Sequence, residues 1–310
     1  MKRYFCNQRM ADWFAGVSHM EKVYPEIDPF HSVFCFTPGV YSLYEENAGG
    51  GSAMWLHLID GPEKALLVDT GVGIGDLKGL VRHLIGDKPL YVVNTHEHWD
   101  HVMGNSQFPA VWCHPRGAEF VRSNYMQPDM WDRFLHSDGR GGEMGYTAED
   151  FIPCRPYELL TCEEGHIFDL GGGHLVEVLH TPGHAPGGLS FLDRKNRILF
   201  SGAMHSGNTL ITAAEYDTEM STVESFLESL ERLCSRCGDD FDCVYAGHEI
   251  VPLERSYIDD EMNVCREIIR DHDCYEFTQP LLGKIFRTHV SGSAGIRFSE
   301  DAFRDTIGKV

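Results

Sequence analysis

The chain has 310 residues, of which 26 are basic and 47 acidic, so its formal net charge is −21 with histidine neutral. This acidic balance and the lack of basic runs argue against nucleic acid and against anionic membrane surfaces as partners. A hydrophobic content of 42% excludes a disordered chain and is enough for one large α/β unit or two domains.

The cysteines indicate the compartment of the protein, and the apolar runs indicate whether it spans a membrane. The ten cysteines are scattered and lack the spacing of a secreted disulfide framework. No apolar run reaches the ~18 residues of a membrane span, and the N-terminal stretch lacks the apolar core of a signal peptide. We expect a cytoplasmic protein that acts on a small molecule without nucleic acid or membrane partners, and a homodimer stays open.

The hydrophobic pattern divides the chain into three parts. Residues 1–30 are of mixed character and form an N-terminal extension. Over 31–250, apolar and β-branched runs bounded by Gly, Pro and Asn predict strands, and helical spacing predicts helices such as 221–236. Strands and helices alternate in two similar halves, which indicates a layered α/β sandwich. Residues 251–310 are expected to form a helical tail, with one helix over 254–270.

Residues 124–160 interrupt this alternation as a candidate insertion. They are rich in Tyr, Met, Trp and Gly, and loops of this length are unusual in compact domains unless they have a function. The apolar side chains could form a lid over a substrate. Alternatively, the segment could pack at the periphery or at a dimer interface.

The most informative segment is His96-Glu97-His98-Trp99-Asp100-His101, which directly follows a predicted buried strand. Three imidazoles and two carboxylates therefore lie in one loop at a strand end. Neutral imidazole is the commonest metal ligand, and an H-x-H pair in an extended chain directs both rings to one side because side chains alternate. Asp100 and His101 fall beyond the turn, where they can serve a second ion.

This segment and four others resemble the metallo-β-lactamase superfamily of metallohydrolases, whose hallmark is HxHxDH. The other matches follow in the family's order at 66–71 (LLVDTG), 181–184 (TPGH), 199–202 (LFSG) and 246–248 (AGH). The resemblance implies a four-layer αββα sandwich with a metal centre at one edge, between the two sheets.

The resemblance also implies which side chains hold the metals. Carried over position by position, it gives two sets of ligands: His96, His98 and His184, and Asp100, His101 and His248. Asp69 is implied to orient a ligand imidazole from behind, which fixes the tautomer and raises the basicity of the ring. Two zinc ions are expected, and iron or manganese also suit histidine and aspartate ligands.

One position departs from the family pattern. The family often carries SGD, whose Asp bridges the metals, whereas this chain reads Ser201-Gly202-Ala203-Met204-His205. Ala203 cannot bind a cation, so three outcomes stay open. Two ions could be held without a bridging carboxylate, His205 could act as a replacement ligand, or a weak second site could leave a one-metal enzyme.

The implied function is a metal-dependent hydrolase whose metal-bound hydroxide cleaves a small ester, thioester or lactone, or a β-lactam-like amide. Asp100 would bind metal, steer the hydroxide and relay a proton. His98 stands where the flavodiiron relatives carry Glu, which favours hydrolysis over redox chemistry. Two other classes stay open: a non-catalytic, metal-stabilised binding protein, because Ala203 removes a bridging group, and a di-iron redox protein, which would need an electron-donor domain.

Overall fold

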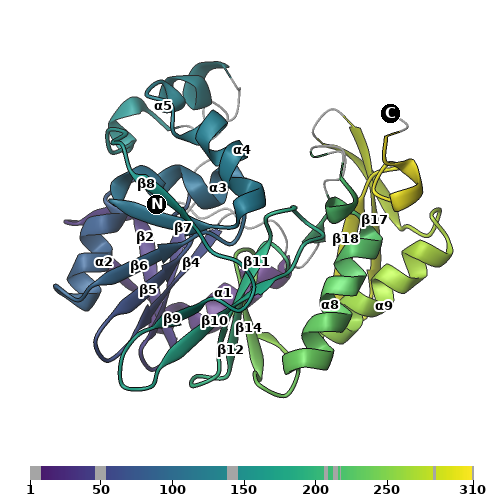
Figure 1. Ribbon diagram of the computed structural model, residues 1–310, viewed down its shortest axis with the longest axis horizontal. Coiled ribbons are helices and arrows are strands. Elements are labelled where there is room, and N and C mark those ends of the chain that lie inside the picture. The colour runs from purple at the N-terminus through teal and green to yellow at the C-terminus, as the bar shows by residue number, and fades with distance from the viewer. Residues whose placement is uncertain are drawn as a thin grey trace.

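Two β-sheets that pack face to face form the centre of the molecule, and helices flank them (Figure 1). One continuous cluster of buried apolar side chains joins the sheets. This arrangement confirms the expected α/β sandwich. None of the helices in the described ranges combines the length and the apolar content that a membrane span requires. The computed structural model describes residues 8–45, 54–137, 146–205, 209–211, 216, 218–281 and 284–308.

The first sheet has eight strands in chain order. They are β1 (Lys22–Tyr24), β2 (Asp28–Thr37), β3 (Val40–Glu45), β4 (Met54–Asp60), β5 (Ala65–Val68), β6 (Leu90–Val93), β7 (Ala110–Cys113) and β8 (Glu158–Thr161). Neighbours from β1 to β5 run antiparallel, and those from β5 to β8 run parallel. Parallel neighbours need crossover connections, and α2 (Leu77–Ile85) and α4 (Pro115–Tyr125) lie in two of them. The sheet therefore gathers the ends of β5 and β6, which precede Asp69 and the histidine-rich segment, at one edge.

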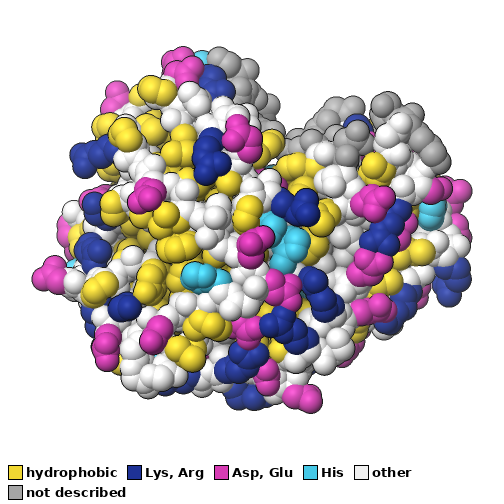
Figure 2. Space-filling model, viewed as in Figure 1, with side chains coloured by type: hydrophobic (Ala, Val, Ile, Leu, Met, Phe, Trp, Pro, Cys, Tyr) yellow, Lys and Arg dark blue, Asp and Glu magenta, His cyan; other side chains and the backbone are white. Residues whose placement is uncertain are grey.

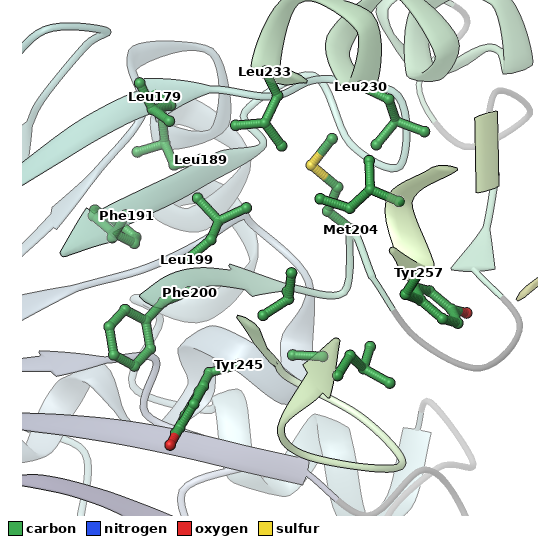
Figure 3. Close-up of a cluster of buried hydrophobic side chains, with 14 of the residues drawn as sticks. Leu179, Leu189, Phe191, Leu199, Phe200, Met204, Leu230, Leu233, Tyr245 and Tyr257 are labelled. Atoms are coloured by element: carbon green, nitrogen blue, oxygen red, sulfur yellow. The ribbon is translucent and has the colours of Figure 1, made fainter. Parts of the chain in front are cut away.

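The second sheet has six strands, in the order β15-β14-β12-β11-β10-β9. They are β9 (Ile167–Asp169), β10 (Leu175–His180), β11 (Leu189–Asp193), β12 (Ile198–Gly202), β14 (Cys243–Ala246) and β15 (Leu253–Glu254). Helix α8 (Val223–Cys237) makes the crossover between the parallel strands β12 and β14. Figure 3 shows Leu230 and Leu233 reaching from α8 into the buried cluster. On the other side, Tyr245 reaches the first sheet, where its hydroxyl lies 2.8 Å from Thr37 Oγ1.

The N-terminal segment packs into this sandwich. Helix α1 (Gln8–Val17) buries Met10 and Phe14. The Phe14 ring lies 4.6 Å from the Tyr44 ring and stacks near Trp55 of β4. The segment therefore adds a helix to the core, and β1 adds the edge strand of the first sheet.

The C-terminal segment corrects the expected helical tail. Helix α9 (Tyr257–Arg270) forms as expected, but strands follow it: β16 (Phe277–Leu281), β17 (Lys284–Ser291) and β18 (Ala294–Phe298). With β13 (Thr209–Leu210) they form a four-stranded sheet in the order β13-β18-β17-β16, which packs on α9. The physical reason lies in the β-branched and aromatic residues of 284–290 (KIFRTHV), which favour strands, and in Gly292, whose φ of +64° suits the turn between β17 and β18.

The candidate insertion packs partly against the loop that follows β5. It contains α5 (Met130–Asp132), a π-helical turn (Arg133–Ser137) and a short 3-10 turn (Ala148–Asp150), and residues 138–145 lie outside the described ranges. Met130, Phe134 and Phe151 are buried in one cluster with Val72 and Ile74 of that loop. These apolar side chains therefore pack into the interior and support the loop that follows β5. A lid or interface role for the segment stays a prediction.

His57 of β4 links the two sheets by hydrogen bonds at both ring nitrogens. Its Nε2 donates to the Ala246 carbonyl oxygen at 2.9 Å, and its Nδ1 lies 3.1 Å from Ser42 Oγ. Because the carbonyl can only accept, Nε2 carries the proton and Nδ1 accepts from the serine hydroxyl. Burial lowers the pKa of His57 to about 4, so the ring is neutral in the folded protein.

We expect this imidazole to make the protein less stable in acid. The unfolded chain takes up a proton near pH 6.5 and the folded chain does not, so the stabilisation is complete above pH 6.5 and is lost as the pH falls towards 4. The loss between pH 7 and pH 5 is about 2 kcal/mol. Urea unfolding at both pH values should show a smaller acid loss in His57→Gln, while the exposed His136→Gln serves as the control. Equal losses in wild type and His57→Gln would contradict this assignment.

Candidate metal centre

The histidine-rich loop begins where β6 ends and turns directly into a short helix. Helix α3 (Trp99–Val102) starts after His98, whose φ and ψ of −70° and 149° are extended. Residues 95–97 form bends rather than a continued strand, yet the His96 and His98 rings face one another, while the helical turn carries Asp100 and His101 to a neighbouring position. The local chain thus separates the motif into two groups.

Three imidazole nitrogens converge in the first cluster, which comprises His96, His98 and His184. His98 Nδ1 lies 2.9 Å from His96 Nε2 and 2.9 Å from His184 Nε2, and the two Nε2 atoms are 3.2 Å apart. Ligands of a tetrahedral zinc ion, each ~2.1 Å from the metal, are about 3.4 Å from one another. The spacing of the three nitrogens therefore suits a shared transition-metal ion.

Hydrogen bonds from behind fix which nitrogen faces the centre in two of the three rings, those of His184 and His96. His184 Nδ1 lies 2.5 Å from the Leu210 carbonyl oxygen, so Nδ1 carries the proton and Nε2 presents its lone pair. Thr95 Oγ1 donates to Asp69 and accepts from His96 Nδ1 at 3.0 Å, which aims His96 Nε2 in the same way. Burial and the neighbouring imidazoles lower the pKa of His96 and of His184 well below the usual value. Neutral rings of this kind are the form that binds metal.

The second cluster comprises Asp100, His101 and His248. His101 Nε2 lies 3.2 Å from His248 Nε2, and His248 Nε2 lies 3.5 Å from Asp100 Oδ2. Asp69 Oδ2 accepts a hydrogen bond from His101 Nδ1 at 2.7 Å, which leaves the His101 Nε2 lone pair facing the cluster. Asp69 thus stands where a ligand-orienting carboxylate was expected.

Two bonds from Trp55 fix the loop that carries His248. The Trp55 backbone N–H donates to Gly247 O at 2.8 Å, and its indole N–H donates to Glu249 O at 2.8 Å. These two hydrogen bonds connect the first sheet to the residues on both sides of His248. The second cluster is therefore assembled between the two sheets, at their common edge.

Thr95 is a support that sequence reasoning missed. Its backbone N–H and its hydroxyl donate to the two oxygens of Asp69, at 2.7 and 2.8 Å. Gly202 packs directly against Thr95, so that a Cβ at position 202 would lie 2.2 Å from Thr95 Oγ1. Any larger residue would displace the threonine. A polar residue immediately before the first motif histidine was the signal available in the sequence.

A buried charged triad holds the loop that follows Asp69. His31 Nδ1 lies 2.9 Å from Asp28 Oδ2, and its Nε2 lies 3.3 Å from Glu45 Oε2. Although burial disfavours its charge, the two carboxylates raise the pKa of His31 to about 10. A Cβ on Gly71 would lie 2.2 Å from Glu45, and one on Gly75 would lie 2.5 Å from Asp28. These glycines therefore serve close packing against the triad.

His205 lies outside both clusters. Its side chain is fully buried, and its Nδ1 contacts a carboxylate oxygen of Glu261 on α9. Ala203 is also buried and offers no donor atom. Both clusters are therefore complete in three donors each without a residue from the 203–205 turn.

The donor sets fit divalent metal ions. Lone pairs of neutral imidazoles repel when nitrogens approach to about 3 Å without a proton or cation between them. The protons of His96, His101 and His184 are held on the far side of each ring. A cation is the partner that satisfies such an arrangement, and N and O donors suit zinc, iron and manganese.

Asp69→Asn should weaken metal binding, because the amide cannot accept from Thr95 and His101 as the carboxylate does. Loss of such a backing group typically costs 10–100-fold in metal affinity. Competition with a chromophoric zinc chelator measures the affinity, and Asp87→Asn, in the exposed turn after α2, is the matched control. Unchanged affinity in Asp69→Asn would contradict its orienting role.

Comparison with known proteins places this geometry in a family. The sequence model of the metallo-beta-lactamase superfamily matches residues 50–235. Acyl-coenzyme A thioesterase MBLAC2 of Gallus gallus is 30% identical over 208 residues, which cover 63% of this chain and 72% of the relative. Hydroxyacylglutathione hydrolase GloC of Haemophilus influenzae is 27% identical over 197 residues, covering 61% and 82%. A metallo-beta-lactamase structure from Pontibacter korlensis aligns with a TM-score of 0.54 at 16% identity, covering 76% of this chain and 99% of that one. The chain, with its two histidine-rich clusters at the edge of an α/β sandwich, belongs to the metallo-beta-lactamase superfamily.

Proposed function

We propose that this protein is a metal-dependent hydrolase that cleaves thioesters or related small esters and lactones. The observation that carries the proposal is the convergence of two three-donor clusters at one edge of the sandwich. The relatives named above are a thioesterase and a hydroxyacylglutathione hydrolase, so thioesters head the list of substrates.

We assign one ion to His96, His98 and His184 and another to Asp100, His101 and His248. A bound zinc ion lowers the pKa of water towards ~7 and polarises an acyl oxygen. The two complete clusters support a two-metal site without a bridging carboxylate, the first of the three outcomes left open at Ala203. Three imidazole nitrogens that converge on one point are a usual ligand set of zinc, so zinc is the ion that we propose.

Asp100 has the position of a residue that can both bind metal and handle a proton. Its carboxylate is mostly buried, and its Oδ2 lies 3.5 Å from His248 Nε2. A carboxylate beside the reacting water can accept its proton and deliver it to the leaving sulfur or oxygen. Asp69 and Thr95 hold the ligand rings in place and keep their protons away from the reacting side.

The mixed charges on the surface favour a small-molecule substrate over a nucleic acid. Figure 2 shows one face of the molecule with its side chains coloured by type. On the face shown, Lys and Arg lie among Asp and Glu, and Arg194 and Arg236 both pair with Glu177. Scattered, neutralised cations do not form a nucleic-acid footprint.

A reducing compartment, such as the cytoplasm, suits the cysteines. Nine of them lie in the described ranges, and all nine are free thiols. Several are buried in the core, including Cys113, Cys162 and Cys265, where burial raises the thiol pKa and makes the sulfur a poor nucleophile.

Asp100→Asn should lower kcat/KM for the best substrate by roughly 10²–10⁴-fold while the fold is retained, because the amide cannot accept the proton. The substrate panel comprises an acyl-CoA, an S-acylglutathione, an N-acyl homoserine lactone and a β-lactam, each assayed with zinc-loaded protein. Asp132→Asn, an exposed carboxylate of α5, is the control.

Two results would contradict these assignments. One is wild-type turnover in Asp100→Asn, which would overturn the proton-transfer role of Asp100. The other is full zinc occupancy without turnover of any acyl compound, which would favour the non-catalytic binding protein that the loss of a bridging carboxylate at Ala203 allows.

A further inference from the structure

A buried carboxylate outside the metal centre connects α9 to the segment that follows β12. Glu261 is fully buried, as are His205 and Thr209. One oxygen of Glu261 contacts His205 Nδ1, and the other accepts from Thr209 Oγ1 at 3.0 Å. Burying a carboxylate costs free energy unless it is paired and hydrogen-bonded. Both of its partners lie in the same segment, so Glu261 fixes two points of that segment to α9.

This segment reaches the metal centre through one carbonyl group. Leu210, next to Thr209, accepts the hydrogen bond from His184 Nδ1. On its other side β13 pairs with β18, with Thr209 opposite Ile296. The bond from Ile211 N to Arg297 O, at 2.9 Å, continues that pairing. Two contacts with the C-terminal part therefore set where the Leu210 oxygen lies.

The position of that oxygen decides how His184 presents its lone pair. Groups that hold the far nitrogen of a ligand histidine set its tautomer and ring orientation, and removing them typically lowers metal affinity 10–100-fold. With Ala203 in place of a bridging carboxylate, the first cluster has three imidazoles as its donors. A tilt of one ring therefore affects a third of its ligand set.

We propose that Glu261 is a positioning residue for the metal ligand His184, acting through Thr209, His205 and the Leu210 carbonyl. The proposal rests on the metal centre of the proposed function. It extends that centre to the C-terminal part of the chain, which holds neither the histidine-rich motif nor the expected orienting residue Asp69.

The His205 ring provides a means of testing this arrangement. Its Nδ1 donates to Glu261, and its Nε2 is buried without a hydrogen-bond partner among the described residues. In Glu261→Gln the amide oxygen can accept from Thr209, while the amide N–H donates to His205 Nδ1 once the ring proton moves to Nε2. The glutamine can thus keep both contacts, whereas Glu261→Leu loses both.

Metal binding by the full-length protein tests the proposal. Competition with a zinc chelator should show 10–100-fold weaker binding of one ion in Glu261→Leu, and affinity close to wild type in Glu261→Gln. In protein loaded with ¹¹³Cd, the three-nitrogen cluster and the cluster with a carboxylate give separate resonances. The resonance of the three-nitrogen cluster should shift or broaden in Glu261→Leu, and the other should persist.

Glu267→Leu is the matched control. Glu267 is also a carboxylate of α9 that contacts an imidazole, but that imidazole belongs to His289 of β17, at 2.7 Å. Equal weakening in Glu267→Leu and Glu261→Leu would overturn the proposal, because general loss of C-terminal packing would explain it. Unchanged zinc affinity in folded Glu261→Leu would overturn it as well.

A second variant keeps the test decisive. If Glu261→Leu does not fold, Thr209→Val removes one of the two bonds at nearly constant volume. Wild-type affinity in Thr209→Val would then overturn the proposal. Failure of the wild-type protein to bind zinc would instead overturn the proposed function, so the two failures are distinguishable.

Discussion

The metal centre depends on one constraint: the lone pairs of its ligand atoms face one another. Five imidazole nitrogens and one carboxylate oxygen point into two small volumes at the sheet edge. Such an arrangement is unfavourable without a cation, because neutral acceptors at about 3 Å repel. It persists in the fold because three of the rings are held from behind, by Leu210, Thr95 and Asp69. The ring nitrogen that faces away from the centre, through its hydrogen bond, is therefore as important for metal binding as the nitrogen that faces the ion.

Each of these backing groups comes from a different part of the chain. Asp69 follows β5, Thr95 follows β6, and Leu210 lies in β13. Trp55 of the first sheet donates a hydrogen bond to the loop that carries His248, and His57 donates one to the strand that leads into that loop. The face-to-face packing of the sheets is therefore a condition for the site, since a shift between them would separate the two halves of each cluster.

Much of the fold and of the site geometry could be predicted from the sequence, because both depend on local signals. Alternating apolar residues between glycines and prolines marked the strands, and the H-x-H-x-D-H segment marked the strand end where ligands gather. The Glu261–His205 contact could not be predicted, because it joins two parts of the chain that have no shared motif or spacing. The strands after α9 were missed for a different reason: a small sheet packed on a helix has exposed faces, and residues 284–290 do not alternate between polar and apolar side chains.

The pairing of β13 with β18 has a consequence for biosynthesis. On a ribosome, His96, His98 and His184 emerge long before residues 294–298, which hold the strand that supports the Leu210 carbonyl. Domains fold as units once their chain is available, and contacts between distant segments form late because loop closure must come first. The nascent polypeptide therefore exposes three imidazoles without their final alignment, and full affinity for its ion arises only after residues 294–298 have been made and paired with β13.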